Sequence, residues 1–271
     1  MHTSQPTDGS ITPQQQQNDA VALSEPRQEV YVWELPVRLT HWVTVISIGV
    51  LTVTGIYIAT PFVGTSGPAV NQYLMGTMRF IHFLTAFVFT ASVLLRIYWA
   101  FAGNTYARWP QFLPLSARRR RGIRKMLAYY VFVRRHPPDE IGHNALAGMT
   151  YLVVFTLFLL QIITGFTLYA LPFERGAFWP TLFGWIIVAF GTQPVRLVHD
   201  LIMWLLLAFT IHHVYSAILI DSEEHSSLLS SIITGWKSLT RRQLETATTE
   251  ETVERKPFWS RTARKKELEH D

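Results

Sequence analysis

Four long apolar runs constrain the fold of this chain more than any other feature of its sequence. They lie at about residues 42–60, 80–101, 145–171 and 197–220. A helix of about 20 apolar residues crosses the hydrocarbon core of a bilayer, and the backbone is helical there because lipid offers it no hydrogen-bond partner. With 49% hydrophobic and 16% charged residues, the composition is too apolar for an ordinary soluble domain. We therefore predict an all-α membrane protein, built as a four-transmembrane-helix bundle.

The distribution of positive charge predicts the orientation of these helices. The connection 103–142 and the C-terminal tail are rich in arginine and lysine, whereas the connections 61–77 and 171–195 share a single cation, Arg175. Because cations accumulate in cytoplasmic segments, we place both basic segments and both termini in the cytoplasm. This predicts a multi-pass protein of a bacterial inner membrane. The basic run lies between two spans, so we interpret it as a topology signal and expect no nucleic-acid partner.

The ends of the chain differ in composition from its centre. Residues 1–29 are rich in Gln, Thr, Ser and Pro, which is typical of a disordered tail. Residues 30–221 hold the four apolar runs and form the predicted transmembrane domain. Residues 222–271 begin with an amphipathic segment at 226–239 and continue as a charged cytoplasmic tail. The apolar patch 183–190 is too short to span comfortably, and we interpret it as interfacial or docked on a partner.

The chain contains no cysteine. This excludes covalent attachment of haem through a C-x-x-C-H motif, and it excludes ligation of an iron–sulfur cluster by cysteine within this chain. If the protein moves electrons, it has to hold a haem through histidine or methionine.

Histidines recur at matched depths in the apolar runs. His199 and His213 are 14 residues apart, which returns them to nearly one helix face, about 21 Å apart along the axis. The predicted topology places His82 and His199 near the outer face and His41 and His213 near the inner face. Imidazole is costly in a membrane unless it is used. We predict two bis-histidine haems b, ligated by His82 with His199 and by His41 with His213. The alternative is a set of interfacial histidines that hydrogen-bond to neighbouring helices.

Helical spacing also separates His213 from its neighbour His212. Relative to His199, His213 is turned by about 40° and His212 by about 140°. One helix has to offer both haems the same bundle interior, so His213 is the predicted ligand and His212 points away.

Arginine precedes three of these histidines by three residues. The pairs are Arg38 with His41, Arg79 with His82 and Arg196 with His199. Residues three apart share a helix face, and arginine binds carboxylates in a bidentate manner. We predict that the three arginines bind haem propionates. The alternative is that arginine is simply common at membrane edges.

Other positions are candidates for cofactor contacts. His143 and Asn144 lie at the inner end of the third apolar run, where they are candidates to contact a quinone head group; interfacial placement is the alternative for His143. Gly49 and Gly55 lie within the first run. They permit close approach of a flat ligand or of another helix, and ordinary helix packing explains them equally well.

Several of these residues carry a resemblance to a known family. They are Arg38-Leu39-Thr40-His41-Trp42, residues 55–61, Arg196-x-x-His199, His213-Val214-Tyr215, Asp221 and residues 226–236. Over residues 30–239 the chain resembles the b-type cytochrome subunit of membrane-bound nickel–iron hydrogenases. It departs from that pattern at Asp200, where a second histidine is expected, and this leaves the role of Asp200 open.

The resemblance implies an electron path. A partner large subunit with a nickel–iron site oxidises hydrogen on the outer side, and a small subunit carries the electrons through iron–sulfur clusters. This chain then passes them through an outer and an inner haem b to membrane quinone. No hydrogen-activating metal is expected in this chain.

Two alternatives stay open from the sequence. The first keeps the haems and changes the partner to another quinone-linked oxidoreductase, such as formate dehydrogenase or thiosulfate reductase. The segment 226–236 and the long outer loop favour a hydrogenase. The second is a transporter or a haem-free membrane anchor, which a reduced-minus-oxidised spectrum without b-type α bands would indicate.

Overall fold

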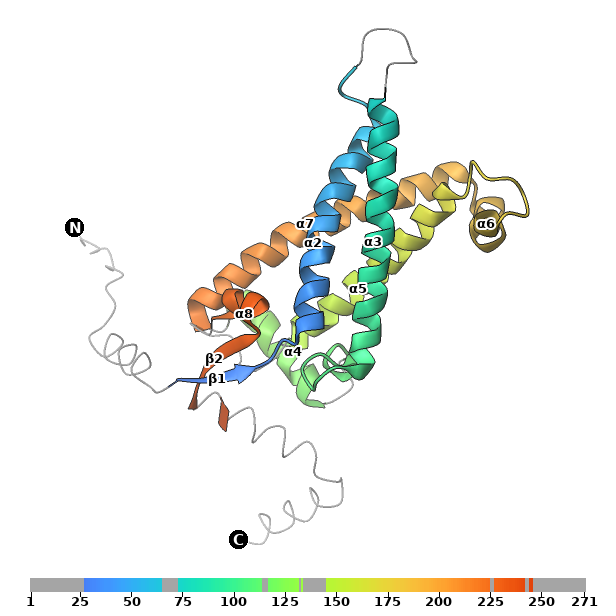
Figure 1. The fold of residues 1–271 in the computed structure, drawn as a ribbon. Helices are drawn as coiled ribbons and strands as arrows, with labels where there is room; N and C mark the ends of the chain where they lie inside the picture. Colours follow the sequence, from blue (N-terminus) through green and yellow to red (C-terminus); the bar gives the residue numbers. More distant parts are fainter. Residues whose placement is uncertain are drawn as a thin grey trace, which may run out of the picture. The chain divides into compact units, whose positions relative to one another are not determined.

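Four long helices dominate the computed structural model. They are α2 (Leu35–Ala59), α3 (Leu74–Ala102), α5 (Ala145–Tyr169) and α7 (Thr192–Glu224) (Figure 1). Each contains a stretch long and apolar enough to cross a membrane, and no other helix among the described residues does. The prediction of a mainly helical chain with four candidate membrane spans is confirmed, although two short strands are present as well.

The structure describes residues 27–64, 73–113, 117–131, 133, 145–224, 227–241 and 244–245. The described chain divides into two units, and one of them, Tyr31–Lys237, contains all of the helices discussed below. His143 and Asn144 lie outside the described residues, as does nearly all of the predicted tail 1–29. The predicted boundaries at 29/30 and 221/222 therefore stay predictions.

The helices α2, α3 and α7 begin earlier than the apolar runs predicted, whereas α5 begins at Ala145 as predicted. α2 starts at Leu35, with Pro36 in its first turn, where the fixed φ of proline fits and its missing N–H costs nothing. α3 starts at Leu74 rather than near Phe80. These additional turns lie outside the apolar runs, so hydropathy alone does not reveal them. As a result, the histidines of α2 and α3 lie well inside their helices.

The four spans pack as two hairpins. α2 packs along α3, and α5 packs along α7, while α3 and α5 share a smaller contact (Figure 1). Each hairpin joins spans that follow one another along the chain, so most helix–helix contacts are made between sequence neighbours.

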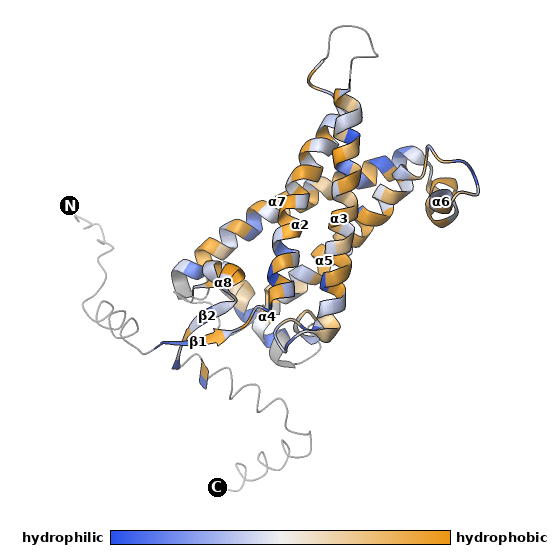
Figure 2. Cartoon of the chain, viewed as in Figure 1, coloured by the Kyte–Doolittle hydropathy of each residue, from blue (hydrophilic) through white to orange (hydrophobic). Residues whose placement is uncertain are grey.

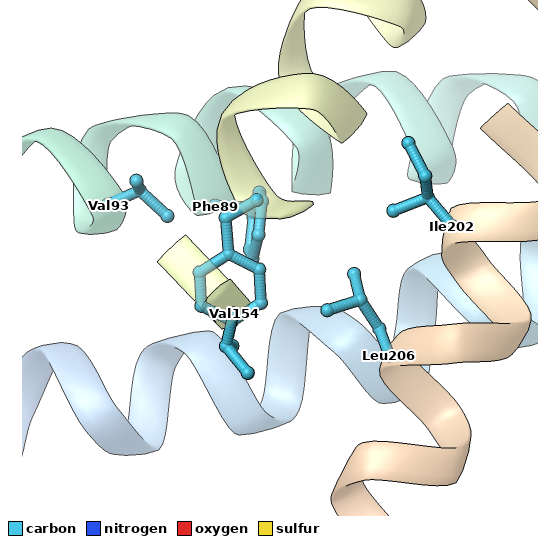
Figure 3. Close-up of a cluster of buried hydrophobic side chains, with 6 residues drawn as sticks. Phe89, Val93, Val154, Ile202 and Leu206 are labelled. Carbon is cyan, nitrogen blue, oxygen red and sulfur yellow. The ribbon is translucent and has the colours of Figure 1, made fainter. Parts of the chain in front are cut away.

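The hairpins meet in an apolar cluster. Its buried side chains come from α3, α5 and α7, and they are Phe89, Val93, Val154, Phe158, Ile202 and Leu206 (Figure 3). Ile48 and Leu51 of α2 pack against this cluster. The rings of Phe89 and Phe158 meet edge to face with centroids 5.2 Å apart, an arrangement that the aromatic quadrupole favours.

Apolar side chains also cover the outside of the spans. Val53 of α2, Leu94 of α3 and Ile218 of α7 are among the many large apolar residues that are exposed. Figure 2 shows hydrophobic colouring along all four long helices. Such surfaces are unfavourable in water but are expected where lipid is the solvent.

A shorter helix, α6 (Phe178–Phe190), contains the apolar patch 183–190. Trp179 and Phe183 stack on the ring of Phe166 of α5, with centroid distances of 5.0 and 5.6 Å. The patch therefore docks on α5 of the same unit through one face. Val188 and other large side chains of its opposite face are exposed.

The segment that follows α7 folds back onto the start of α2. It contains α8 (Leu228–Thr234), and Gly235 at its end has φ +92°. The indole of Trp33 donates to Ser231 Oγ at 3.1 Å, and the indole of Trp42 donates to the carbonyl of Ile232 at 3.4 Å. A side chain at Gly235 would collide with Tyr31. This region was predicted only as an amphipathic surface segment.

The remaining described elements are short. They are the 3-10 turn Trp109–Gln111, the helix α4 (Ala117–Tyr130), and the strands β1 (Arg27–Tyr31) and β2 (Trp236–Thr240), which pair in a two-stranded sheet.

Candidate functional site

Histidines from different helices meet in two pairs. The rings of His41 of α2 and His213 of α7 have centroids 6.4 Å apart. His82 of α3 and Met203, one turn after His199 on α7, both lie within 4 Å of a methyl group built at Gly55, so His82 and His199 come to the same part of the bundle. These are the two pairings that the sequence predicted. Their role as iron ligands stays a prediction.

His82 lies against a threonine and a glycine of α2. Its Nδ1 is 2.9 Å from Oγ1 of Thr54. A methyl group built at Gly55 would lie 3.4 Å from Cε1 of His82 and 3.9 Å from Sδ of Met203. Gly55 therefore lets the imidazole rest directly on the backbone of α2, whereas Gly49 has nothing within 4 Å of such a methyl group.

His199 has a matching environment on α5. Its Nδ1 is 2.9 Å from Oγ1 of Thr164, and a methyl group built at Gly165 would lie 3.2 Å from its Cε1. The other ring nitrogen, Nε2, is 3.3 Å from the side-chain nitrogen of Gln161. The Oε1 atom of Gln161 is buried without a partner among the described residues.

The pair formed by His41 and His213 has a different environment. Nδ1 of His41 is buried without a hydrogen-bond partner among the described residues, and its ring meets that of Trp42 edge to face at 5.2 Å. The ring of His213 stacks on Phe209 at 5.5 Å and contacts Tyr151 at 6.2 Å. Aromatic rings therefore hold this pair where hydroxyl groups hold the other.

His212 faces away from the pair. It is exposed, its Nε2 lies 3.4 Å from Oγ of Ser216, and its ring is 6.5 Å from that of Tyr130 in α4. The structure thus places His213, and not His212, beside His41, as the helical spacing predicted.

The predicted propionate-binding arginines occupy different environments. Arg38 donates a hydrogen bond to the carbonyl of Ile233 in α8, while its Nε is buried without a partner among the described residues. Arg79 and Arg196 are exposed. Asp200, which directly follows His199, is exposed as well.

The sequence interpretation missed several residues of these sites. Thr54, Thr164, Gly165 and Gln161 were not singled out, although a signal was present. The dipeptide Thr-Gly occurs near the C-terminal end of both the first and the third apolar runs. Its position relative to a histidine depends on how two helices pack, so the sequence alone did not reveal its partner.

A half-buried arginine of α3 was also missed. The guanidinium of Arg96 lies 5.4 Å from the ring centre of Phe112 and 6.0 Å from that of Phe155. It also reaches the carbonyl of Ala107 at 3.4 Å. These contacts hold the segment after α3 against the bundle. A long side chain with a covered stem and a charged group that reaches polar atoms is typical of arginine at a membrane edge.

The apolar cluster lies between the two histidine pairs along the helices. On α7, Ile202 and Leu206 of the cluster separate His199 from His213. The two pairs thus occupy two depths of one bundle, about 21 Å apart along α7 by its helical rise.

Comparison with known proteins assigns the family. The sequence profile of the family described as prokaryotic cytochrome b561 matches residues 32–235, which include both histidine pairs. The chain belongs to this family. It is a multi-pass membrane cytochrome b, and haem b is the cofactor that its family implies.

Similar proteins cover most of the chain. The probable Ni/Fe-hydrogenase B-type cytochrome subunit of Cupriavidus necator is 38% identical over 222 residues, which are 81% of this chain and 91% of that protein. The protein of the same name from Azotobacter vinelandii is 39% identical over 211 residues, 77% of this chain and 88% of that protein. The probable Ni/Fe-hydrogenase 1 B-type cytochrome subunit of Escherichia coli K12 is 36% identical over 214 residues, 77% and 90% of the two chains.

The residues of both pairs fit a cytochrome b. Two neutral imidazoles from facing helices are the donor set that low-spin haem iron takes from a helical bundle. The glycines of the two Thr-Gly dipeptides lie beside the imidazoles of His82 and His199, where a side chain would push each ring away. In the other pair, the buried Nδ1 of His41 lacks a partner among the described residues, so this ring is not committed to a structural hydrogen bond.

Proposed function

We propose that this chain is the membrane cytochrome b subunit of a respiratory uptake nickel–iron hydrogenase. It would carry electrons to membrane quinone from the iron–sulfur small subunit, which receives them from a nickel–iron large subunit. The observation that carries this proposal is the meeting of histidines in two pairs at two depths of a bundle from this family. The printed names of the relatives support the choice of hydrogenase as partner.

Each histidine pair is assigned one haem b, which supplies one-electron redox chemistry when bound. His82 with His199 would ligate the outer haem, and His41 with His213 the inner haem. The chain's own contribution is to present two imidazoles from facing helices, to fix their orientation, and to keep water out with the apolar cluster between the pairs.

The arginines are assigned by location. Arg79 and Arg196 are exposed near the ends of helices that carry the outer pair, where a propionate can reach the helix surface. Arg38 has one buried nitrogen without a partner among the described residues, which supports a role at the inner haem in addition to its contact with α8.

The orientation follows from the basic segments. α4 begins with the cation-rich run of the connection between α3 and α5, which supports cytoplasmic placement of this connection and of both termini in an inner membrane. Electrons arriving from the outside would then reach quinone near the inner pair. His143 and Asn144 are the proposed contacts of the quinone head group.

Three measurements on the full-length, affinity-tagged chain test the proposal. A reduced-minus-oxidised spectrum should show b-type α bands, and a pyridine haemochrome assay should approach two haems per chain. Copurification should bring down the hydrogenase subunits. Absence of b-type bands would refute the cytochrome function, and one haem at saturation would refute one of the two pairs. A formate dehydrogenase partner in the copurified complex would establish the alternative oxidoreductase.

A further inference from the structure

Hydrogen-bond geometry defines the tautomer of the two outer histidines. A threonine hydroxyl has a single proton to donate. Thr54 donates it to the carbonyl of Val50 at 2.7 Å, and Thr164 donates it to the carbonyl of Leu160 at 2.7 Å. Each threonine oxygen can therefore only accept from the imidazole that lies 2.9 Å away. The proton of each ring is thus on Nδ1, and the lone pair is on Nε2.

A further contact of His199 agrees with this tautomer. The side-chain nitrogen of Gln161, which can only donate, lies 3.3 Å from Nε2 of His199. Nε2 of His199 is therefore unprotonated, as an iron ligand has to be, and its single lone pair would pass from the Gln161 amide to iron when haem binds.

The two hairpins repeat the same arrangement of residues. In each, a Thr-Gly dipeptide near the end of the first helix faces a histidine in the first third of the second helix. The threonine holds Nδ1, and the glycine makes room for the ring. Both threonines are buried, with 4% and 8% of their surface exposed. The same chemistry at two unrelated helix contacts indicates that the hydroxyls serve the histidines rather than general packing.

In the inner pair, Nδ1 of His41 has no such threonine among the described residues. Among the described residues, no hydroxyl contacts Nδ1 of His41, which is buried and unpartnered, and His213 has aromatic neighbours instead. A threonine hydroxyl thus lies at Nδ1 of both outer histidines, whereas none lies at Nδ1 of His41 among the described residues.

We propose that Thr54 and Thr164 are positioning residues of the outer site. They fix the tautomer and ring orientation that present Nε2 of His82 and His199 to iron. By accepting hydrogen bonds from the Nδ1–H groups they also make both imidazoles stronger electron donors, which favours the ferric form and lowers the midpoint potential of the outer haem. This inference rests on the proposed function, in which these two histidines ligate a haem.

The test uses valine, which has the shape of threonine without its hydroxyl. Thr54→Val and Thr164→Val are compared with Thr54→Ser and Thr164→Ser, which keep the hydroxyl. Thr167→Val is the matched control, because Thr167 is fully buried on α5 and donates to Ile163 at 2.7 Å without contacting a histidine. Each full-length protein is purified, and its haem content, its potentiometric titration and the electron paramagnetic resonance signals of its ferric haems are measured.

The expected result is specific to one haem. Thr54→Val and Thr164→Val should raise the midpoint potential of the haem that His199→Ala removes, and should shift the low-field resonance of that haem, with the other haem unchanged. The serine variants should stay at the wild-type potential, and Thr167→Val should alter neither haem.

Several outcomes would overturn the proposal. One is that both valine variants have the same outer-haem potential and the same outer-haem resonance as Thr167→Val. Another is loss of the outer haem in the serine variants as well as the valine variants, because the volume of threonine would then matter and its hydroxyl would not. A wild-type protein without haem would instead refute the proposed function, so the two failures are distinguishable.

Discussion

The two histidine pairs share the helix α7, yet different kinds of side chain surround them. In the proposed outer pair, His82 and His199 each have a buried threonine hydroxyl at 2.9 Å. In the proposed inner pair, His41 has a buried Nδ1 without a partner among the described residues, and His213 stacks on an aromatic ring. Polar contacts orient one pair, and ring packing orients the other.

This difference bears on the direction of electron movement. A hydrogen-bonded imidazole donates more strongly to iron and favours its oxidised form. The outer site should therefore have the lower potential of the two. Electrons released by hydrogen oxidation outside would then move towards the inner pair down a potential difference that the chain itself helps to create.

The largest expected effect comes from removing one imidazole from each pair. His199→Ala should remove the outer haem, and His213→Ala the inner haem, so that each variant keeps about half of the wild-type haem content in a pyridine haemochrome assay, because one ligated iron remains. His212→Ala is the matched control and should keep both haems, since this residue is exposed. Loss of haem in the control with retention in His213→Ala would show that the inner ligand is misassigned.

A smaller effect is expected from filling the space beside the outer imidazoles. Gly165→Ala puts a methyl group 3.2 Å from His199, and Gly55→Ala puts one 3.4 Å from His82. Overpacking of this kind costs about 1–3 kcal/mol, so Gly165→Ala should lose outer haem more readily on heating than Gly55→Ala. Gly49→Ala, with open space around the methyl group, should match the wild type. Equal behaviour of all three variants would contradict the close approach.

The inner site should respond to changes in its aromatic packing. Phe209→Leu removes the ring that stacks on His213 at 5.5 Å, a contact of a kind that contributes about 0.5–1.5 kcal/mol. We expect a changed resonance of the inner haem and an unchanged outer haem. If the outer resonance moved instead, the assignment of aromatic packing to the inner site would be wrong.

The smallest effect should come from the exposed arginines. Arg79→Gln and Arg196→Gln remove a positive charge near the proposed outer propionates, which disfavours the reduced haem, so its potential should fall. This direction is opposite to that expected for the threonine variants. Because exposed charge interactions contribute only about 0–1 kcal/mol and salt screens them, the fall should diminish in potentiometric titrations at high salt. A fall that persists at high salt would indicate a buried contact.

Features that depend on one helix at a time were predictable from the sequence. The four spans follow from the length of the apolar runs, and the facing of His213 rather than His212 follows from 3.6 residues per turn. The pairing of His41 with His213 required only the predicted topology, because depth in the membrane limits which residues of different helices can meet.

Features that depend on the register between two helices were not predictable. Thr54 meets His82 because of how α2 lies along α3, and no local pattern in either helix reveals that register. The contact of Arg38 with Ile233 requires the chain after α7 to fold back onto α2, which hydropathy does not report. The early start of α3 at Leu74 was missed because its first turn lies outside the apolar run.

The sharing of α7 between the two pairs has a consequence for biogenesis. His41 and His82 belong to the first hairpin, and both of their partners belong to α7, the last span to leave the ribosome. The first hairpin therefore enters the membrane with neither ligand pair complete, and each proposed pair forms only when the second hairpin docks against the first. Cofactor loading would then be a late step of maturation, and a chain that ends before α7 would mature with no bis-histidine site.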